Sequence, residues 1–284
     1  MSRALQLKEE GNRLFQKGNY VGAESLYSQA IIEDPKNPAL YTNRAMARLK
    51  LSLWDSVITD CQSVLALPAA AAGAPASVLK AHYYTSQARL ALDDPDGALS
   101  AGLAAHALCA ASNDKSLAAV TAAVLRAKKA RWERREKRRV RGEQALEREM
   151  LELLRADVAA AAVAAADVEG EVDEDERAAM EEEAREKEER LMAVFERSRR
   201  LAGEGLREVP DWAIDDISFG FMVDPVMTKT GKSYERASIM EHLRRHPCDP
   251  LTREPLVPSD LRPNMALRQA CEDFLKDNGW AADW

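Results

Sequence analysis

Two lysines and two asparagines in the first third of the chain suit a ligand with closely spaced carboxylates. Lys8 and Asn12 are four residues apart, so both would lie on one face of a helix. Asn43 and Lys80 fall at related positions further along the chain. Cationic and amide groups that converge on one groove can fix such a ligand through charge-assisted hydrogen bonds. The alternative is that Lys8 and Lys80 are solvated surface lysines, which is the usual state of a lysine.

An internal repeat predicts the helices that would bring these four residues together. Residues 4–37 align with residues 38–71, and after an alanine-rich insertion at 69–76 a third unit follows at about 79–112. Each unit predicts two antiparallel helices with small residues where the backbones come close. The recurring positions of the first unit are Gly11, Tyr20, Ala23, Tyr27, Ala30 and Pro35.

That spacing resembles the tetratricopeptide repeat (TPR), whose stacked units form a solenoid with a concave groove. Within this resemblance, the carboxylate clamp of co-chaperone TPR domains is matched by Lys8, Asn12, Asn43 and Lys80. The clamp implies that the groove binds the C-terminal Glu-Glu-Val-Asp tails of heat-shock chaperones. Where many clamps carry an arginine, this chain has Tyr84. Its neighbour Tyr83 is predicted to line an apolar pocket for a side chain of the tail.

The last quarter of the chain, residues 209–284, has the composition of a separate small domain. It holds seven of the 12 prolines. A glycine-containing turn at 229–232 predicts a β-hairpin, and residues 237–246 predict a helix. Asn264 is placed to cap a final helix.

Several strings in this segment resemble the U-box, a fold with the shape of a RING domain that is held by hydrogen bonds, salt bridges and packing instead of zinc. They are ISF at 217–219, DPV at 224–226, GKSYER at 231–236 and CDPLTR at 248–253. The resemblance implies that the domain has no covalent nucleophile and docks a ubiquitin-charged conjugating enzyme. Carried over residue by residue, the apolar docking surface is Ile217, Phe219 and Pro250, and the cation that positions the enzyme and its ubiquitin is Arg253. For Ile217 and Phe219 the alternative is ordinary core packing.

Zinc binding is the alternative for the whole segment. The side chains that would supply four ligands are His242, His246, Cys248 and Cys271. A RING, however, needs two sites with paired cysteines such as C-x-x-C, and the sequence has no such pair. We therefore expect neither a metal nor another cofactor.

The middle of the chain, residues 126–208, predicts two long charged helices interrupted near 168–176. Residues 126–141 hold ten Lys and Arg against two Glu. Trp132 is the one aromatic among them, so base stacking is not favoured, although a nucleic-acid-binding arm stays an alternative. Further along, an apolar spacing suits either a helical hairpin or a coiled-coil homodimer, and its positions are Leu151, Leu154, Val158, Ala161, Ala165 and Val168.

Composition excludes some classes of protein. No apolar run approaches the roughly 18 to 20 residues of a membrane span, and the first residues lack the hydrophobic core of a signal peptide. Four scattered cysteines fit a reducing compartment. These features predict a cytoplasmic protein, with the nucleus as a second location. A net charge of −7 gives no general bias toward nucleic acid.

The predicted architecture is mainly α, with a TPR solenoid at 1–125, a charged helical segment at 126–208 and a small α+β U-box domain at 209–284. This order resembles that of co-chaperone ubiquitin ligases. The resemblance implies a homodimeric ligase that ubiquitinates misfolded clients held by chaperones, for degradation by the proteasome. A non-enzymatic adaptor that only binds chaperone tails is the alternative.

Overall fold

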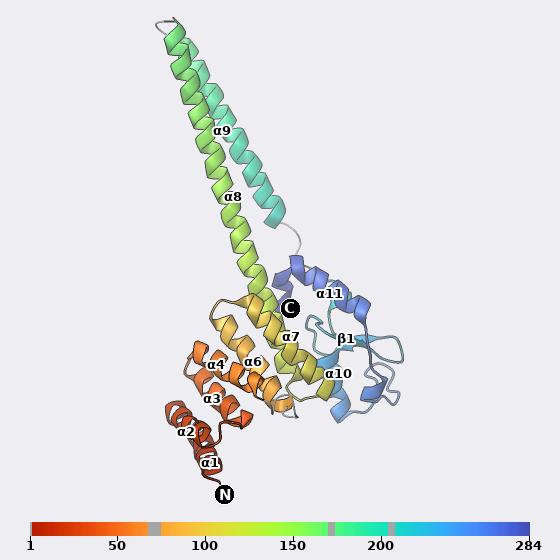
Figure 1. Cartoon of the computed structure of the whole chain (residues 1–284). Coiled ribbons are helices and arrows are strands. Elements are labelled where there is room, and N and C mark those ends of the chain that lie inside the picture. Colours follow the sequence, from red (N-terminus) through yellow and green to blue (C-terminus); the bar gives the residue numbers. More distant parts are fainter. Residues whose placement is uncertain (1, 68–74, 170–173, 204–207) are drawn as a thin grey trace. The chain divides into compact units, whose positions relative to one another are not determined.

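The computed structural model describes residues 2–67, 75–169, 174–203 and 208–284. Contacts divide the chain into two compact units, one of residues 1–133 with 209–284 and the other of residues 134–208. Helix α8 (Leu117–Glu169) begins in the first unit and continues into the second (Figure 1). Within the described ranges, no helix is both long and apolar enough to cross a membrane.

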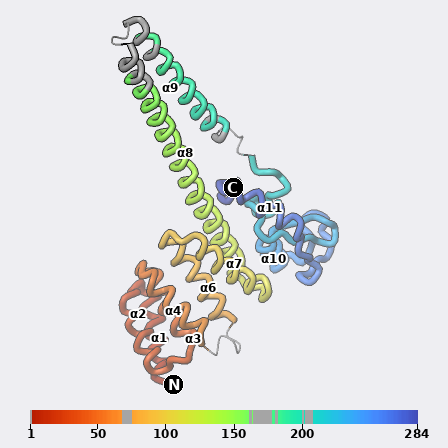
Figure 2. Tube along the Cα trace, turned by 45° about the horizontal axis from the view of Figure 1, so that its top comes forward, coloured from red at the N-terminus to blue at the C-terminus, as the bar shows by residue number. Residues whose placement is uncertain are grey.

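The first unit opens with three helix pairs that stack in sequence order (Figure 2). Their helices are α1 (Arg3–Gln16), α2 (Tyr20–Glu33), α3 (Pro38–Lys50), α4 (Trp54–Ala66), α6 (Pro75–Ala91) and α7 (Pro95–Ser112). Each helix contacts the next, and α3 also contacts α6, so the first helices of the second and third pairs are neighbours. This arrangement confirms the predicted solenoid. The third pair begins at Pro75 instead of the predicted 79, and most of the predicted insertion at 69–76 lies outside the described residues.

Small residues let the paired helices approach each other, as the repeat predicts. A β-carbon on Gly11 would lie 2.7 Å from Cε1 of Tyr27, so only glycine permits the observed distance between α1 and α2. At the matching position of the second pair, Ala45 is fully buried and packs in one cluster with Cys61. The close approach is therefore built into the residue types at these positions.

A buried ion-pair network fixes α3 against α2 and α4. The guanidinium of Arg44 donates to both carboxylate oxygens of Asp60, at 2.6 Å for Nη2 to Oδ1. Arg48 pairs with Asp60 at 3.0 Å and with Glu24 at 2.7 Å. Because Asp60 is only 1% exposed, its charge requires close cationic partners. These two arginines are thus committed to the fold and not to a ligand.

The C-terminal segment of the first unit folds around a small antiparallel sheet. Its elements are η1 (Asp211–Ala213), β1 (Pro225–Met227), β2 (Ser233–Glu235), α10 (Arg236–Arg245), η2 (Pro258–Asp260), β3 (Arg262–Pro263), α11 (Met265–Asp277) and η3 (Gly279–Asp283). The strand order is β2-β1-β3, with Val226 opposite both Tyr234 and Pro263. The predicted hairpin, helix and Asn264-capped helix are present, and Asn264 accepts a hydrogen bond from the N–H of Leu267 at 3.1 Å. Strand β3 was not predicted, because two residues carry no alternation.

The start of α8 packs against this C-terminal segment. Val223 lies in one core cluster with Val124 and Ala127 of α8. The indole N–H of Trp132 donates to the carbonyl of Asp277 at 3.0 Å, and a β-carbon on Gly279 would overlap the Trp132 side chain. These contacts place the start of α8, as far as Glu133, in the first unit together with the C-terminal segment.

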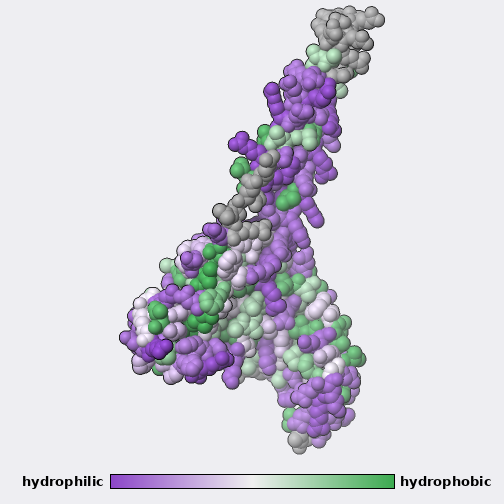
Figure 3. Space-filling view, turned by 180° about the vertical axis from the view of Figure 1, so that it is seen from behind, coloured by the Kyte–Doolittle hydropathy of each residue, from purple (hydrophilic) through white to green (hydrophobic). Residues whose placement is uncertain are grey.

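The second unit is a helical hairpin of α8 and α9 (Glu174–Gly203). Arg155 pairs with Glu188 at 2.8 Å and Arg199 pairs with Glu147 at 2.5 Å, so the two helices run antiparallel. On α8, the half-buried positions include Leu151, Leu154 and Val158, as expected for a hairpin. The side chains of Ala161, Ala165 and Val168, and residues 170–173 of the predicted break, lie outside the described part. Hydrophilic residues dominate the face of the hairpin seen in Figure 3.

Candidate functional site

The first of two surface loops in the C-terminal segment is closed around Asp215. The N–H of Asp215 donates to the carbonyl of Gly220 at 2.9 Å, and its carbonyl accepts from the N–H of Phe219 at 2.8 Å. Its carboxylate oxygen Oδ2 accepts from the N–H and the hydroxyl of Ser218, at 2.8 and 2.6 Å. Asp215 is fully buried, so the loop is shaped from inside by its side chain.

The second loop is built in the same way around Asp249. The N–H of Asp249 donates to the carbonyl of Glu254 at 2.8 Å, and its carbonyl accepts from the N–H of Arg253 at 2.9 Å. Its Oδ1 accepts from the N–H groups of Leu251 and Thr252, at 2.8 and 3.2 Å. Asp249 is 2% exposed. Each loop is therefore held by its own buried aspartate, which forms hydrogen bonds with backbone or side-chain groups of the residues that follow it.

Each loop holds the fourth residue after its aspartate in the left-handed region of backbone space. The φ angles are +56° for Phe219 and +62° for Arg253. Such angles are unfavourable for residues other than glycine and persist where the surroundings enforce them, often at functional sites. The side chain of Phe219 is 73% exposed as a result, and Arg253 is exposed as well.

The other carboxylate oxygen of each aspartate ties its loop to the β1–β2 hairpin. Oδ1 of Asp215 accepts from the N–H of Glu235 at 2.9 Å, and Oδ2 of Asp249 accepts from the hydroxyl of Thr230 at 3.1 Å. Burial by itself would raise the pKa of Asp249. Hydrogen bonds from Leu251, Thr252 and Thr230 outweigh burial and lower that pKa, so the carboxylate form is the one the loop stabilises.

The predicted docking residues lie on or beside these two loops. Phe219 projects outward, whereas Ile217 is half-buried and packs against the core cluster that contains Tyr234. Pro250 is half-buried, and the next residue, Leu251, is 69% exposed. Sequence reasoning missed Leu251, although its place after an Asp-Pro turn was a usable signal.

Two of the four side chains considered as zinc ligands, those of His242 and Cys271, have other surroundings in the fold. A ring nitrogen of His242, Nε2, lies 3.0 Å from the carbonyl oxygen of Cys248, which fastens α10 to the second loop. Cys271 is buried at 1% exposure. Among the described residues, no group of three or more His, Cys, Asp or Glu side chains is arranged to hold a metal ion.

The predicted tail-binding residues lie on α1, α3 and α6, the first helices of the three pairs. Oδ1 of Asn12 accepts from the hydroxyl of Tyr27 at 2.8 Å and from Nδ2 of Asn43 at 3.2 Å. Both acceptor positions of that oxygen are thereby filled. The amide nitrogen of Asn12 is therefore the group of this side chain that can donate a hydrogen bond to a ligand. Lys8 is half-buried and Lys80 is exposed. The structure thus joins the two amides directly and leaves the two cations accessible.

Tyr83 and Tyr84 have different surroundings. The hydroxyl of Tyr84 donates to Sδ of Met46 at 3.2 Å, and burial raises the pKa of Tyr84 to about 12. Tyr84 therefore joins α6 to α3. At this position, where many clamps carry an arginine, the chain has an uncharged side chain. Tyr83 is half-buried and packs against the cluster that contains Leu79 and Cys109.

Glu235, at the end of β2, is a buried acid beside the first loop. Its Oε2 accepts from the N–H groups of Val223 and Asp224, at 2.7 and 2.9 Å. Burial raises the pKa of Glu235 to about 7, and the charges of Asp224 and Asp215 raise it as well, against those two hydrogen bonds. The carboxyl group thus changes charge near neutral pH.

Comparison with known proteins identifies the C-terminal segment. The family model of the U-box domain matches residues 209–280. Over 98% of its length, the chain is 28% identical to the E3 ubiquitin-protein ligase CHIP of Arabidopsis thaliana, and the match covers 95% of that protein. Ubiquitin conjugation factor E4 of Schizosaccharomyces pombe is 38% identical over 26% of this chain and 7% of the factor.

A second group of relatives matches short parts of the chain. The human small glutamine-rich tetratricopeptide repeat-containing protein beta is 44% identical over 22% of this chain and 20% of that protein. A solved structure of the first TPR of Spaghetti (RPAP3) with an HSP90 peptide covers 37% of this chain and 79% of that chain at 33% identity, with a TM-score of 0.34.

Glu235 gives a prediction about stability and pH. The pKa of Glu235 is raised from 4.5 to about 7 in the folded chain. The stabilisation that this shift gives to the folded state is therefore complete below about pH 4.5 and is lost as the pH rises through about 7. Glu235→Gln keeps an oxygen for the two N–H groups and does not titrate. Between about pH 5 and pH 8 we expect the unfolding free energy of the wild type to fall by roughly 2 to 3 kcal/mol relative to Glu235→Gln.

Urea unfolding at a series of pH values measures this difference. Glu241→Gln is the matched control, because hydrogen bonds from Arg244 and Arg245 lower the pKa of Glu241 and remove it from that pH window. Parallel pH profiles for the wild type and Glu235→Gln would contradict the account.

Proposed function

We propose that this chain, which carries a U-box and is similar over nearly its whole length to CHIP, is a ubiquitin-protein ligase that acts as a co-chaperone. The observation that carries the proposal is the pair of aspartate-held loops. Phe219 on the first loop and Leu251 and Arg253 on the second are exposed, and Pro250 is half-buried. Exposed apolar residues of this kind, held rigidly next to a cation, suit a protein partner.

The proposed mechanism is positioning of a ubiquitin-charged conjugating enzyme. Three of the four thiols of the chain are buried and do not suit a covalent step. Burial raises the pKa of Cys61, Cys109 and Cys271 to about 12, 11 and 12, so these thiolates are not formed at neutral pH. The mechanism does not use the remaining thiol, Cys248. Ubiquitin would pass directly from the conjugating enzyme to a lysine of the substrate, and the ligase would lower the barrier by holding the thioester in a reactive posture.

Chaperone tails are the proposed ligand of the TPR helices. The accessible cations of Lys8 and Lys80 and the linked amides of Asn12 and Asn43 support it, because this combination suits a peptide with a terminal carboxylate and acidic side chains. Tyr83 is proposed to contact an apolar side chain of the tail. Misfolded clients held by the chaperone would be the substrates, for degradation by the proteasome. A cytoplasmic location and a homodimer through the α8–α9 hairpin belong to the same proposal.

Charge reversal tests the tail-binding assignment. Lys8→Glu and Lys80→Glu each place a negative charge where the tail carries carboxylates. We expect each to weaken binding of a peptide that ends in Glu-Glu-Val-Asp by on the order of thirtyfold or more, which corresponds to about 2 kcal/mol. Fluorescence anisotropy measures the affinity. Lys36→Glu, in the exposed turn between the first two pairs, is the control with the same change in net charge, and unchanged affinity in both groove variants would refute the assignment.

Alanine substitution tests the docking surface. Phe219→Ala, Ile217→Ala, Pro250→Ala and Arg253→Ala are each expected to slow ubiquitin discharge from a charged conjugating enzyme by at least about tenfold, because docking residues of this type contribute about 1 to 2 kcal/mol or more. The matched control is Leu153→Ala, which shortens another exposed apolar side chain, 61% exposed on α8.

The outcomes of the discharge assay separate the alternatives. Self-ubiquitination that survives both Ile217→Ala and Pro250→Ala would remove the docking assignment. A wild-type chain that is inactive with a panel of conjugating enzymes, yet binds the tail peptide, would identify a non-enzymatic adaptor.

A further inference from the structure

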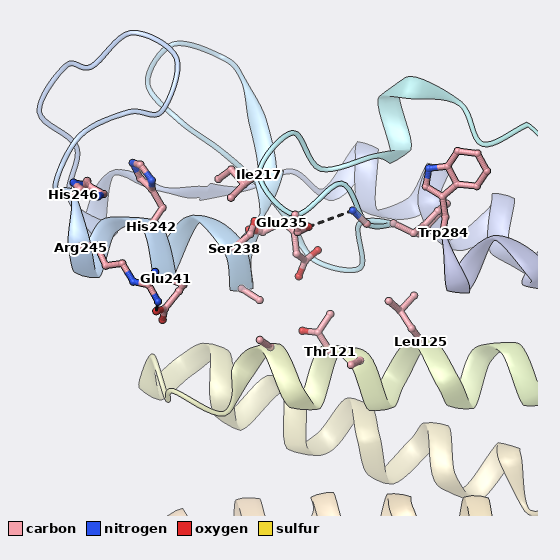
Figure 4. Close-up of a pocket in the computed structure, with 16 residues that line it drawn as sticks. Thr121, Leu125, Ile217, Glu235, Ser238, Glu241, His242, Arg245, His246 and Trp284 are labelled. Atoms are coloured by element: carbon pink, nitrogen blue, oxygen red, sulfur yellow. Dashed lines mark hydrogen bonds and ion pairs between the residues drawn. The ribbon is translucent and has the colours of Figure 1, made fainter.

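A cavity of about 560 Å³ lies between the start of α8 and the C-terminal segment, and residues of the first loop form part of its wall (Figure 4). Its volume falls within the range of small-molecule sites, which is roughly 300 to 1,000 Å³. Most of its wall is apolar, with Ala118, Ala122 and Leu125 from α8 and with Ile217 and Ala237 opposite them. A ligand in this cavity would therefore gain chiefly from apolar contact.

Two polar atoms in the cavity wall lack partners. Oε1 of Glu235 and Oγ1 of Thr121 are both buried and make no hydrogen bond within the part of the chain that the structure describes. The two residues are 5% and 6% exposed. Figure 4 shows them facing each other across the cavity, Glu235 from the end of β2 and Thr121 from α8. A buried acceptor without a partner is unfavourable by about 1 to 3 kcal/mol, so a donor placed between them would be bound well.

The charges around the cavity favour a cation over an anion. Glu235 and Glu241 are the acids of the cavity lining, with Asp215 and Asp224 near the carboxyl group of Glu235 and with Lys128 as a cation that also interacts with it. The arginine at the rim, Arg245, already pairs with Glu241 at 2.8 Å, so its charge is compensated. Arg236 is likewise occupied by Asp224 at 2.6 Å.

We propose that this cavity is a binding site for a small flat ligand that joins an aromatic ring to a cationic N–H group, such as an amidine. The ring would lie against Leu125, Ile217 and Ala237, and the N–H groups would donate to Oε1 of Glu235 and Oγ1 of Thr121. The site does not depend on the proposed ligase activity. Ile217 nevertheless belongs to both the cavity wall and the first loop. A bound ligand would therefore contact the loop that carries Phe219.

Benzamidine is the probe, used with the full chain at about pH 8, where a carboxyl group with a pKa of about 7 is ionised. Titration calorimetry is expected to give a dissociation constant on the order of 1 mM or tighter, as suits a ligand of this size. Acetophenone, which has the ring and no N–H donor, is expected to bind at least about tenfold more weakly.

Two variants locate the probe. Glu235→Gln keeps the acceptor for Val223 and Asp224 and turns the free oxygen into an N–H₂ group, so the affinity should fall at least about tenfold. Ala118→Phe, at an exposed position of α8, fills the cavity with a second ring and should abolish binding without disturbing the fold. Glu10→Gln, the same change at an exposed position of α1 outside the cavity lining, should bind benzamidine like the wild type.

Three results would overturn the proposal. The wild type fails to bind benzamidine, which leaves water as the only occupant of the cavity. Binding survives Ala118→Phe, which places the probe elsewhere. Binding survives Glu235→Gln although the circular-dichroism melting curve shows a folded chain, which removes the assigned hydrogen bond.

Discussion

The carboxylates of Asp215 and Asp249 hold two surface loops in conformations that the loops would not keep alone. In each loop one carboxylate oxygen accepts hydrogen bonds from residues that follow the aspartate, and the other reaches the β1–β2 hairpin. Both aspartates are buried, where an unpaired carboxylate would be strongly destabilising, so the hydrogen bonds and the burial require each other. A zinc ion performs the same task in a RING by binding side chains from two loops. Here the fastening is made of ordinary hydrogen bonds.

The exposure of Phe219 and Arg253 follows from that fastening. A positive φ turns each side chain outward, and its unfavourable energy is offset by the closed ring of backbone bonds around each aspartate. The tail-binding helices use a different principle. There, helix periodicity and repeat spacing determine which residues face the groove. The two arginines of α3 form ion pairs with Asp60 that hold the helices together. Lys8 and Lys80 remain as the accessible cations of the assigned set.

The helical part of the fold was predictable because its signals are local and repeated. Gly11 and Ala45 mark close helix approaches at a fixed period, and Asn264 caps α11 through its own side chain. The U-box strings likewise located the hairpin and the candidate docking residues. Other features depend on residues distant in sequence, such as the contact of Trp132 with Asp277 or the bond between Tyr84 and Met46. No periodicity encodes these contacts, so neither the extension of the first unit to Glu133 nor the uncharged role of Tyr84 could be read from the chain. The cavity beside Glu235 is of the same kind, since its walls come from α8 and from a segment about a hundred residues later.

We propose that buried Asp249, which does not itself touch the conjugating enzyme, controls how fast that enzyme discharges its ubiquitin. Single-turnover discharge of ubiquitin to free lysine tests this most directly in the wild type, Asp249→Ala and Asp249→Asn. The asparagine retains an oxygen for the N–H groups of Leu251 and Thr252, whereas the alanine leaves them without an acceptor. We expect Asp249→Ala to slow discharge by about a hundredfold, because a small displacement of the second loop misplaces the thioester, and Asp249→Asn to keep most of the wild-type rate. Equal rates for the wild type and a folded Asp249→Ala would contradict it.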